Sequence, residues 1–320
     1  MTYRSYILAT GSYLPDRVMT NKDLEEMVDT SDEWIFQRSG IKERRIAAEG
    51  QPTSDLATRA AQDALKSAGL KPEDIDGIIV ATTTADSTFP SVAVSVQAAL
   101  GAPVGIAFDI QAVCTGFVYA LSVADNFIRN GQLKRVLVIG AEKMSSILDW
   151  NDRTTCVLFG DGAGAVILEA REDDKAGILS THLYANGTLK DLLYTDGGVS
   201  TTGESGHIVM QGREVFKHAV SLMAGAVQTA LDENNISADQ INWLVPHQAN
   251  IRIIESTAKK LAMPMEKVIV TVEKHGNTSA ASIPLAFDSA VKSGKIKRGE
   301  LVLMEAMGGG ITWGSALLRY

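Results

Sequence analysis

Short hydrophobic runs alternate with longer amphipathic segments along most of the chain. Residues 77–81, 136–142 and 301–307 have the length and composition of buried strands, whereas residues 54–69 carry apolar side chains at helical spacing. Strands that alternate with helices of about 12–16 residues predict βαβ units and a mainly parallel sheet. We expect the helix at 54–69 to begin with Ser54 as its N-cap and to end at Gly69.

This pattern occurs twice, which indicates an internal duplication. Residues 63–84 align with residues 229–250 at an offset of 166, and the GQLKR segment at 131–135 aligns with GKIKR at 294–298 at an offset of 163. In both copies the basic segment precedes a strand, a Gly-rich turn and a closing strand.

The duplication predicts an α/β fold of two related halves, residues 1–170 and 171–320. Two copies of one αβ unit should pack about a pseudo-dyad with helices between their sheets. We therefore expect a five-layer α/β/α/β/α sandwich. Residues 171–207 are polar and Gly-rich, and we expect them to form the joint and surface loops.

Composition narrows the classes of function. The 320 residues are 45% apolar and carry a formal net charge of −8, which argues against nucleic-acid and anionic-membrane binding. The chain has no long apolar run and its start lacks a signal-peptide core, so a cytoplasmic enzyme is the default expectation. Its two cysteines form no disulfide framework and show no zinc-site spacing, so we expect no metal.

Cys114 is the first candidate for chemistry. It follows a predicted strand at 107–110 and precedes a predicted helix at 115–130. The dipole and free N–H groups of a helix N-terminus lower the pKa of a thiol and can bind an oxyanion. The alternative is an inert buried cysteine, the role that we expect for Cys156 in the strand-like segment 155–159.

His247 and Asn277 complete a candidate site. His247 follows a buried strand and could donate a hydrogen bond, act as a base or be purely structural. Asn277 could donate to a substrate carbonyl or cap a helix expected at 278–293. The offsets of 163 and 166 place Cys114 on Asn277 and Ala81 on His247. Ligands gather at the carboxyl ends of parallel strands, so we expect all three residues at one site between the halves.

Two further motifs are weak evidence of function when each is taken alone. The glycine run 308–310 permits close approach of a ligand to the backbone, but no Lys-Ser/Thr pair follows it, as a P-loop would require. Arg252, Lys259 and Lys260 form a predicted basic helix face, whose alternative is an ordinary solvated surface.

Seven segments distributed over the whole chain carry a family resemblance. They are TSDEWIFQRSGIKERR (30–45), ATTTADSTFPS (81–91), QAVCTGF (111–117), FGDGAGA (159–165), VPHQANIR (245–252), KHGNTSAAS (274–282) and EAMGGGITWGSALLRY (305–320). With these motifs the chain resembles the β-ketoacyl-acyl-carrier-protein synthase III family, the initiating condensing enzymes of type II fatty-acid synthesis in the thiolase-like superfamily.

The resemblance implies a decarboxylative condensation. Cys114 would take an acyl group, expected to be acetyl, from acyl-CoA. Malonyl-acyl carrier protein would then lose CO₂ and attack the acyl-cysteine to give a 3-oxoacyl carrier protein. His247 and Asn277 would donate to the malonyl thioester oxygen, and the N–H groups of Cys114 and Gly309 would form a second oxyanion hole. Coenzyme A thioesters are substrates in this scheme, and no cofactor is expected.

The resemblance also implies binding residues. Trp34 and Arg153 would flank the adenine of coenzyme A, Arg38 would lie on its phosphate side, and Gly212, Phe216 and Asn250 would line the pantetheine tunnel. Phe89 would reach across a homodimer into the partner's acyl pocket, while Lys217, Arg252, Lys259 and Lys260 would dock the carrier protein. Met307 replaces the phenylalanine that is usual before the triple glycine, with an expected effect on the acyl pocket or on the support of His247 and Asn277.

Five other functions are alternatives to this one. A degradative thiolase needs a second catalytic cysteine in the C-terminal half, and no cysteine follows Cys156. Hydroxymethylglutaryl-CoA synthases and plant polyketide synthases have longer chains. A secondary-metabolite condensing enzyme with the same triad is the main rival. A non-catalytic acyl-CoA-binding protein would not need the complete Cys/His/Asn set.

Overall fold

Two mixed β-sheets form the centre of the molecule. The computed structural model describes residues 3–172 and 175–320. The first sheet has the order β1 (Arg4–Tyr13), β7 (Asp161–Arg171), β6 (Arg135–Lys143), β4 (Gly77–Ala81) and β5 (Ile106–Ile110). The second has the order β8 (Gly177–Ala185), β13 (Thr312–Arg319), β12 (Leu301–Gly308) and β11 (Trp243–Pro246). Two small ribbons, β2 (Arg17–Thr20) with β3 (Glu43–Ile46) and β9 (Leu193–Thr195) with β10 (Ile208–Met210), lie outside them.

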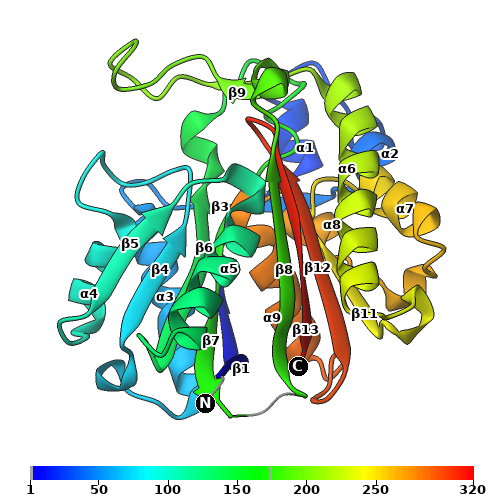
Figure 1. Cartoon of the computed structure of the whole chain (residues 1–320). Coiled ribbons are helices and arrows are strands. Elements are labelled where there is room, and N and C mark those ends of the chain that lie inside the picture. Colours follow the sequence, from blue (N-terminus) through cyan, green and yellow to red (C-terminus); the bar gives the residue numbers. More distant parts are fainter. Residues whose placement is uncertain (1–2, 173–174) are drawn as a thin grey trace.

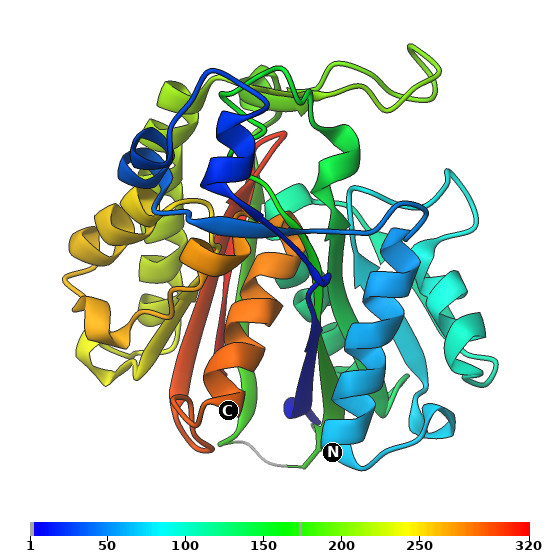
Figure 2. The ribbon, with the colours of Figure 1, turned by 180° about the vertical axis from the view of Figure 1, so that it is seen from behind.

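Helices cover both outer faces and fill the space between the sheets (Figures 1 and 2). The outer helices are α3 (Thr53–Ala68) and α4 (Val92–Leu100) on the first sheet, and α6 (Gly212–Glu233) and α7 (Ile251–Lys260) on the second. The inner helices are α5 (Gly116–Arg129) and α9 (Ser282–Lys292), which share one hydrophobic core with both sheets. The short helices are α1 (Asn21–Glu25), α2 (Asp32–Ser39) and α8 (Val272–His275). The five-layer sandwich is confirmed.

The duplication is visible in the strand order. Strands β1, β7, β6 and β4 of the first half correspond in order to β8, β13, β12 and β11 of the second. Among the described residues, β5 alone in the two large sheets lacks such a counterpart. No helix of the described residues is long and apolar enough to span a bilayer.

The expectation of a mainly parallel sheet was wrong. Parallel pairing occurs between β4 and β5, between β4 and β6, and between β11 and β12. The remaining pairings in the two large sheets are antiparallel, because β7 and β13 fold back beside β6 and β12. Only a few residues join β12 to β13, and so short a connection cannot make the crossover that a parallel pair requires.

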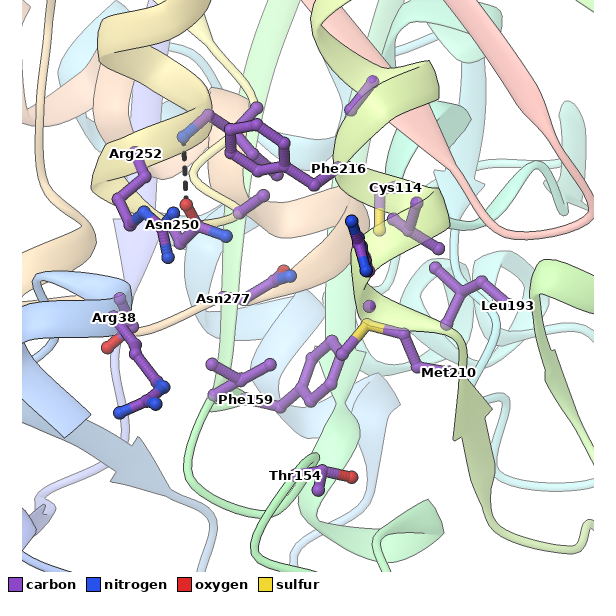
Figure 3. A pocket seen from close by; sticks show the side chains of 18 of the residues that line it. Arg38, Cys114, Thr154, Phe159, Leu193, Met210, Phe216, Asn250, Arg252 and Asn277 are labelled. Atoms are coloured by element: carbon purple, nitrogen blue, oxygen red, sulfur yellow. Dashed lines mark hydrogen bonds between the residues drawn. The ribbon is translucent and has the colours of Figure 1, made fainter. Parts of the chain in front are cut away.

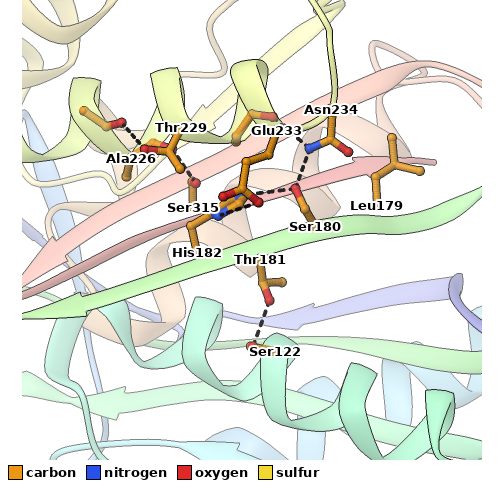
Figure 4. Close-up of polar contacts among 12 residues, drawn as sticks. Ser122, Leu179, Ser180, Thr181, His182, Ala226, Thr229, Glu233, Asn234 and Ser315 are labelled. Atoms are coloured by element: carbon orange, nitrogen blue, oxygen red, sulfur yellow. Dashed lines mark hydrogen bonds and ion pairs between the residues drawn. The ribbon is translucent and has the colours of Figure 1, made fainter.

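Residues 171–207 are more than a joint with surface loops, which corrects that expectation. They include β8, which lies at the edge of the second sheet and also contacts the inner helix α5. Figure 4 shows how this strand is attached: Thr181 shares a hydrogen bond with Ser122 of α5 (2.8 Å), and Asn234 donates to Ser180 (2.7 Å). Residues 173 and 174 of the segment lie outside the described part of the chain.

The start of α3 also differs from the prediction. The helix begins at Thr53, with Pro52 as its N-cap, whereas Gly69 ends it as expected. Ser54 cannot cap the helix because it already lies in the first turn, where its N–H donates to Asp86 (3.0 Å).

Glycines allow the inner helix α9 to approach the first sheet closely. A Cβ atom at Gly164 of β7 would lie 2.6 Å from the backbone nitrogen of Leu285 and 2.6 Å from the carbonyl carbon of Pro284. At Gly140 of β6 it would overlap the carbonyl oxygen of Ala280. Backbone atoms cannot move aside as the end of a side chain can, so these positions exclude any larger residue.

We predict that Gly164→Ala lowers the free energy of unfolding by about 1–3 kcal/mol, because the added methyl group overpacks the contact between β7 and α9. Chemical denaturation of the two proteins measures this difference. Gly187→Ala is the matched control, since a Cβ atom at Gly187 meets no atom within 4 Å. Equal stability of the Gly164→Ala variant and the unmodified protein would contradict this account of the interface.

Candidate functional site

Two cavities meet at Cys114. The first, about 550 Å³, is lined by Cys114, His247 and Asn277 together with residues of α2, α6 and α7. Figure 3 shows Cys114 and Asn277 at this cavity with Phe216 and Leu193 nearby. The second, about 450 Å³, lies on the other side of Cys114. The structure therefore brings together the three residues that the sequence placed at one site.

Cys114 lies in a tight 3₁₀ turn, Val113–Thr115, between β5 and α5. The turn begins at Val113 with φ 48°, a backbone conformation that is rare for a β-branched residue. Strained backbone of this kind occurs often at functional sites.

Burial dominates the ionisation of Cys114. It raises the pKa of the thiol to about 12, although the Ser279 hydroxyl and the N–H groups of Cys114 and Gly309 act in the opposite direction. The expected lowering of this pKa by the helix N-terminus is wrong for the free protein, because the loss of hydration outweighs these hydrogen bonds. The unliganded protein thus holds Cys114 as a neutral thiol.

His247 is buried and neutral. It follows β11, and its backbone N–H donates to the carbonyl oxygen of Glu305 on β12 (2.8 Å). Burial lowers the pKa of the imidazole to about 3. Nδ1 lies 2.6 Å from the Ser282 hydroxyl oxygen, which also accepts a hydrogen bond from the N–H of Gln248 (3.3 Å). The Ser282 proton can then point to Nδ1, so we assign the imidazole proton to Nε2.

Sequence analysis missed the role of Ser282. This residue begins α9 and lies five positions after Asn277, within the KHGNTSAAS segment. Only the folded chain brings it against His247, 35 positions away.

Asn277 is fixed by hydrogen bonds on its backbone and on its side-chain oxygen. Its N–H donates to the Leu158 carbonyl (2.9 Å), and its own carbonyl accepts from Gly160 (3.0 Å). Its side-chain Oδ1 accepts from the N–H of Ser279 (2.9 Å), which leaves the Nδ2 group to donate at the cavity. Asn277 does not cap α9: that helix begins at Ser282, after a 3₁₀ turn at Ser279–Ala281.

The structure corrects the proposed match of Cys114 with Asn277 in the duplication. The two 3₁₀ turns, Val113–Thr115 and Ser279–Ala281, correspond at an offset of 166, and both begin at a residue with φ 48°. Cys114 therefore corresponds to Ala280 rather than to Asn277. The offset of 163 holds for the basic segments at 131–135 and 294–298 but not for the turns.

The mouth of the first cavity is built around Trp34. The guanidinium of Arg38 lies 4.3 Å from the centre of its ring, and that of Arg153 lies 5.2 Å from it. Arg153 is anchored to the Asp29 carbonyl (2.5 Å). Of these cations, Arg38 lines the cavity and Arg153 stands beside it.

Residues of α6 and α7 form the opposite wall of the first cavity. Gly212 is the first residue of α6, and Phe216 follows one turn later. Asn250 is the N-cap of α7, where its Oδ1 accepts from the N–H of Ile253 (2.9 Å). Arg252 lies 5.6 Å from the centre of the Phe216 ring.

Met307 lies beside the triad rather than in the second cavity. It lines the first cavity and packs in a cluster with Val215, Ala219 and Ile253. Met307 was expected to affect either the acyl pocket or the support of His247 and Asn277, and its position fits the second of these effects. Sequence reasoning also missed Thr154, Leu193 and Met210, which line this cavity from a turn and from the strands β9 and β10.

Other candidate residues lie outside the first cavity. Gly309 lines the second cavity, on the far side of Cys114. Phe89 is 84% exposed, and Lys259 and Lys260 are exposed at the end of α7.

Within the described residues, no group of three or more His, Cys, Asp or Glu side chains could hold a metal ion. Cys156 lies in a buried cluster as expected, but in a turn rather than in a strand.

Comparisons with known proteins give consistent matches along the chain. Two family models match, 3-oxoacyl-(acyl-carrier-protein) synthase III at residues 108–187 and the C-terminal domain of the same enzyme at residues 231–320. The chain is 61% identical to the β-ketoacyl-acyl-carrier-protein synthase III of Paramagnetospirillum magneticum, with 100% of both chains covered.

Solved structures give the same result. The crystal structure of 3-oxoacyl-acyl-carrier-protein synthase III from Aquifex aeolicus matches with a TM-score of 0.94 and 54% identity, covering 99% of this chain and 100% of that one. The priming β-ketosynthase of the R1128 polyketide pathway also has a TM-score of 0.94, at 34% identity, covering 99% of this chain and 96% of that one. The fold alone thus does not separate the two groups.

Proposed function

Because the chain belongs to the β-ketoacyl-acyl-carrier-protein synthase III family, we propose that Cys114, His247 and Asn277 carry out its condensation. The enzyme is an acyltransferase that initiates type II fatty-acid synthesis. One observation carries the assignment of residues: two cavities meet at a buried cysteine that faces two neutral hydrogen-bond donors. The first half of the chain, residues 1–170, supplies the nucleophile, and residues 171–320 supply the donors.

The two cavities suit the two ends of an acyl-CoA thioester. The first takes the pantetheine arm past Gly212, Phe216 and Asn250, with the adenine between Trp34 and Arg153 and a phosphate at Arg38; the second takes the acyl group. In this pose the thioester carbonyl lies at Cys114. Attack by sulfur forms an acyl-cysteine, and the N–H groups of Cys114 and Gly309 stabilise the oxyanion. The proximity of both N–H groups to the sulfur supports this role.

Decarboxylation of the malonyl group then depends on His247 and Asn277. Loss of CO₂ places negative charge on the malonyl thioester oxygen, which Nε2–H of His247 and Nδ2–H of Asn277 stabilise. Neutral donors are suited to this step because a carboxylate at the same place would repel the enolate. Burial keeps His247 neutral at neutral pH, since it lowers the pKa of the imidazole to about 3. The enolate carbon attacks the carbonyl carbon of the acyl-cysteine, the C–S bond to Cys114 breaks, and the cysteine sulfur leaves as the 3-oxoacyl carrier protein forms.

The primer is proposed to be acetyl-CoA, and the active form a homodimer. Phe89 is a large apolar side chain that is 84% exposed, an arrangement that favours burial against a second copy. The second cavity remains open in one chain alone, and Phe89 of the partner subunit would close it. A closed cavity limits the length of the acyl group that the enzyme accepts.

The carrier protein is proposed to dock beside the mouth of the first cavity. Arg252 and Lys217 line that cavity, and Lys259 and Lys260 extend the basic surface along α7. Local positive charge can steer an acidic carrier protein toward a chain whose net charge is −8. This surface also points the arm of the carrier at Cys114.

A secondary-metabolite condensing enzyme is less well supported than a fatty-acid enzyme. The chain is 61% identical to a β-ketoacyl-acyl-carrier-protein synthase III and 34% identical to the priming ketosynthase of a polyketide pathway. The two kinds of enzyme share one fold. The acyl-CoA that each accepts as primer is therefore the property that distinguishes them.

We predict that Cys114→Ala abolishes formation of the acyl-enzyme, whereas His247→Ala and Asn277→Ala permit it and lower the rate of malonyl decarboxylation at least about 100-fold, the usual effect of losing an oxyanion donor. Intact-protein mass spectrometry follows acylation, and release of labelled CO₂ follows decarboxylation. The Cys156→Ala variant serves as the control for labelling. Acylation at Cys156, or equal loss of both steps in the His247 variant, would refute the division of roles.

We predict that Arg252→Glu raises the KM for malonyl-acyl carrier protein about 10-fold or more, because one contact of the docking surface becomes repulsive. Acylation by acyl-CoA in the absence of the carrier should change little. Lys66→Glu is the control, since it makes the same change of charge on the exposed side of α3. An unchanged KM in the Arg252 variant would remove the docking surface from the account.

A further inference from the structure

The buried thiol of Cys114 needs a base, and the residues considered so far do not provide one. Burial raises the pKa of the thiol to about 12, and a negative charge on Glu142 raises it further. His247 is a poor base because the pKa of its imidazole is about 3. Forming the thiolate must therefore be coupled to a proton acceptor inside the protein.

Glu142 is a fully buried carboxylate on β6 that the mechanism has not used. Its Oε2 accepts hydrogen bonds from Thr84 Oγ1 (2.6 Å), Thr83 N (3.0 Å) and Thr82 Oγ1 (3.3 Å). Its Oε1 accepts from Ser279 Oγ (2.9 Å). Every contact is a donor to the carboxylate, and none of the donors is a lysine or arginine of the described chain. This set of neutral donors stabilises an anion without removing its capacity to take a proton.

Ser279 connects Glu142 to the nucleophile. Its hydroxyl donates to Glu142 and also lies beside the sulfur of Cys114, where it favours the thiolate over the thiol. While the hydroxyl proton is directed to Glu142, a lone pair of the Ser279 oxygen is available to take the proton of the thiol. Its backbone N–H meanwhile holds Oδ1 of Asn277. Ser279 adopts φ 48°, which is uncommon for a residue other than glycine. One strained residue thus contacts the nucleophile, the buried carboxylate and one of the proposed donors.

We propose that Glu142 accepts the proton of the Cys114 thiol through the hydroxyl of Ser279. This deepens, and rests on, the function proposed above, in which Cys114 is the nucleophile. Ser279 contacts the reacting sulfur, and Glu142 acts through it.

The transfer moves two protons and leaves the total charge unchanged. The S–H bond of Cys114 breaks as its proton bonds to Ser279 Oγ, and the original hydroxyl proton of Ser279 passes to Oε1 of Glu142. A thiolate with a neutral carboxylic acid replaces a thiol with a carboxylate. The site therefore holds one negative charge before and after the step, whereas loss of the proton to water would leave two buried negative charges together.

The proton can return by the same path. Cys114 attacks the carbonyl carbon of the thioester. The bond from that carbon to the coenzyme A sulfur then breaks, and the sulfur leaves as a thiolate. Glu142 gives its proton to Ser279, and Ser279 gives its own to that sulfur. Coenzyme A is released as the free thiol, and Glu142 is again a carboxylate.

Burial raises the pKa of Glu142 to about 7, against the lowering effect of its hydrogen bonds. The charged neighbours of Glu142 form hydrogen bonds with other residues. Lys143, the next residue in sequence, donates to the Gln51 carbonyl (2.8 Å). Asp161, on the adjacent strand, accepts from Ser145 and Ala47. A pair made of Glu142 and Cys114 should then lose its first proton near pH 7. The form that results, a Glu142 carboxylate with a Cys114 thiol, is the reactive one, because the carboxylate takes the proton as the sulfur attacks.

The test is the rate at which iodoacetamide alkylates Cys114, measured from pH 5.5 to 9.5 by peptide mass spectrometry. The reaction needs neither acyl-CoA nor carrier protein, so its result does not depend on the proposed substrates. In the unmodified protein we expect the rate to rise with pH through an inflection near 7. In Glu142→Gln we expect that inflection to disappear and the rate at pH 7.5 to fall about 10-fold or more.

The opposite sign would overturn the proposal. If Glu142 only repels the thiolate, removing its charge lowers the pKa of Cys114, and Glu142→Gln reacts faster at pH 7.5. An unchanged rate would overturn it as well. Normal condensation by Glu142→Gln would remove the relay but leave the proposed function intact.

Two further variants keep the test decisive. Ser279→Ala interrupts the path while retaining the Glu142 carboxylate and the N–H that holds Asn277, and it should lose the inflection near pH 7 too. Its result decides the matter if Glu142→Gln does not fold.

Glu305→Gln is the matched control, because Glu305 is also a fully buried carboxylate but lacks a hydrogen-bond path to Cys114 among the described residues. It should retain the profile of the unmodified protein.

Discussion

The site depends on the mutual packing of the two halves at their 3₁₀ turns. A Cβ atom at Gly308 of β12, in the second half, would lie 2.8 Å from the backbone nitrogen of Cys114 in the first half. A Cβ atom at Gly140 of β6, in the first half, would overlap the carbonyl of Ala280 in the second. Each half thus supplies a glycine on which the turn of the other half rests. This reciprocal contact sets Cys114 against Ser279 and brings Asn277 and His247 to the same cavity.

Close packing also determines the chemistry, because it buries the reacting groups. Burial makes charged forms unfavourable: it holds Cys114 as a thiol and His247 as a neutral imidazole. Neutral donors then act on charge that develops only during the reaction, without the cost of reorganising solvent. The same environment strengthens the case for an internal proton acceptor, since creation of a second buried anion beside Glu142 would be costly.

The sequence predicted the layers and the membership of the site well, because hydrophobic periodicity and the duplication are properties that the chain itself displays. It brought Cys114, His247 and Asn277 to one site, although the offset that matched Cys114 with Asn277 was wrong. It failed where tertiary contacts decide the outcome. The pKa of Cys114 depends on burial by the opposite half, and the first turn of α3 donates to Asp86, 32 positions away from Ser54, rather than to a cap side chain. Ser282 and Glu142 gave no signal because a single serine or glutamate acquires its role only from distant neighbours.

The central claim is that one cysteine at the junction of two cavities first receives an acyl group and then releases it to a carbanion. Intact-protein mass spectrometry tests this claim directly, with acetyl-CoA added first and malonyl-acyl carrier protein second. The account predicts that Cys114 gains one acetyl group and then loses it, while the carrier becomes a 3-oxoacyl thioester. Failure of acetyl-CoA to label Cys114, or an acetyl group that persists after malonyl-acyl carrier protein is added, would contradict it.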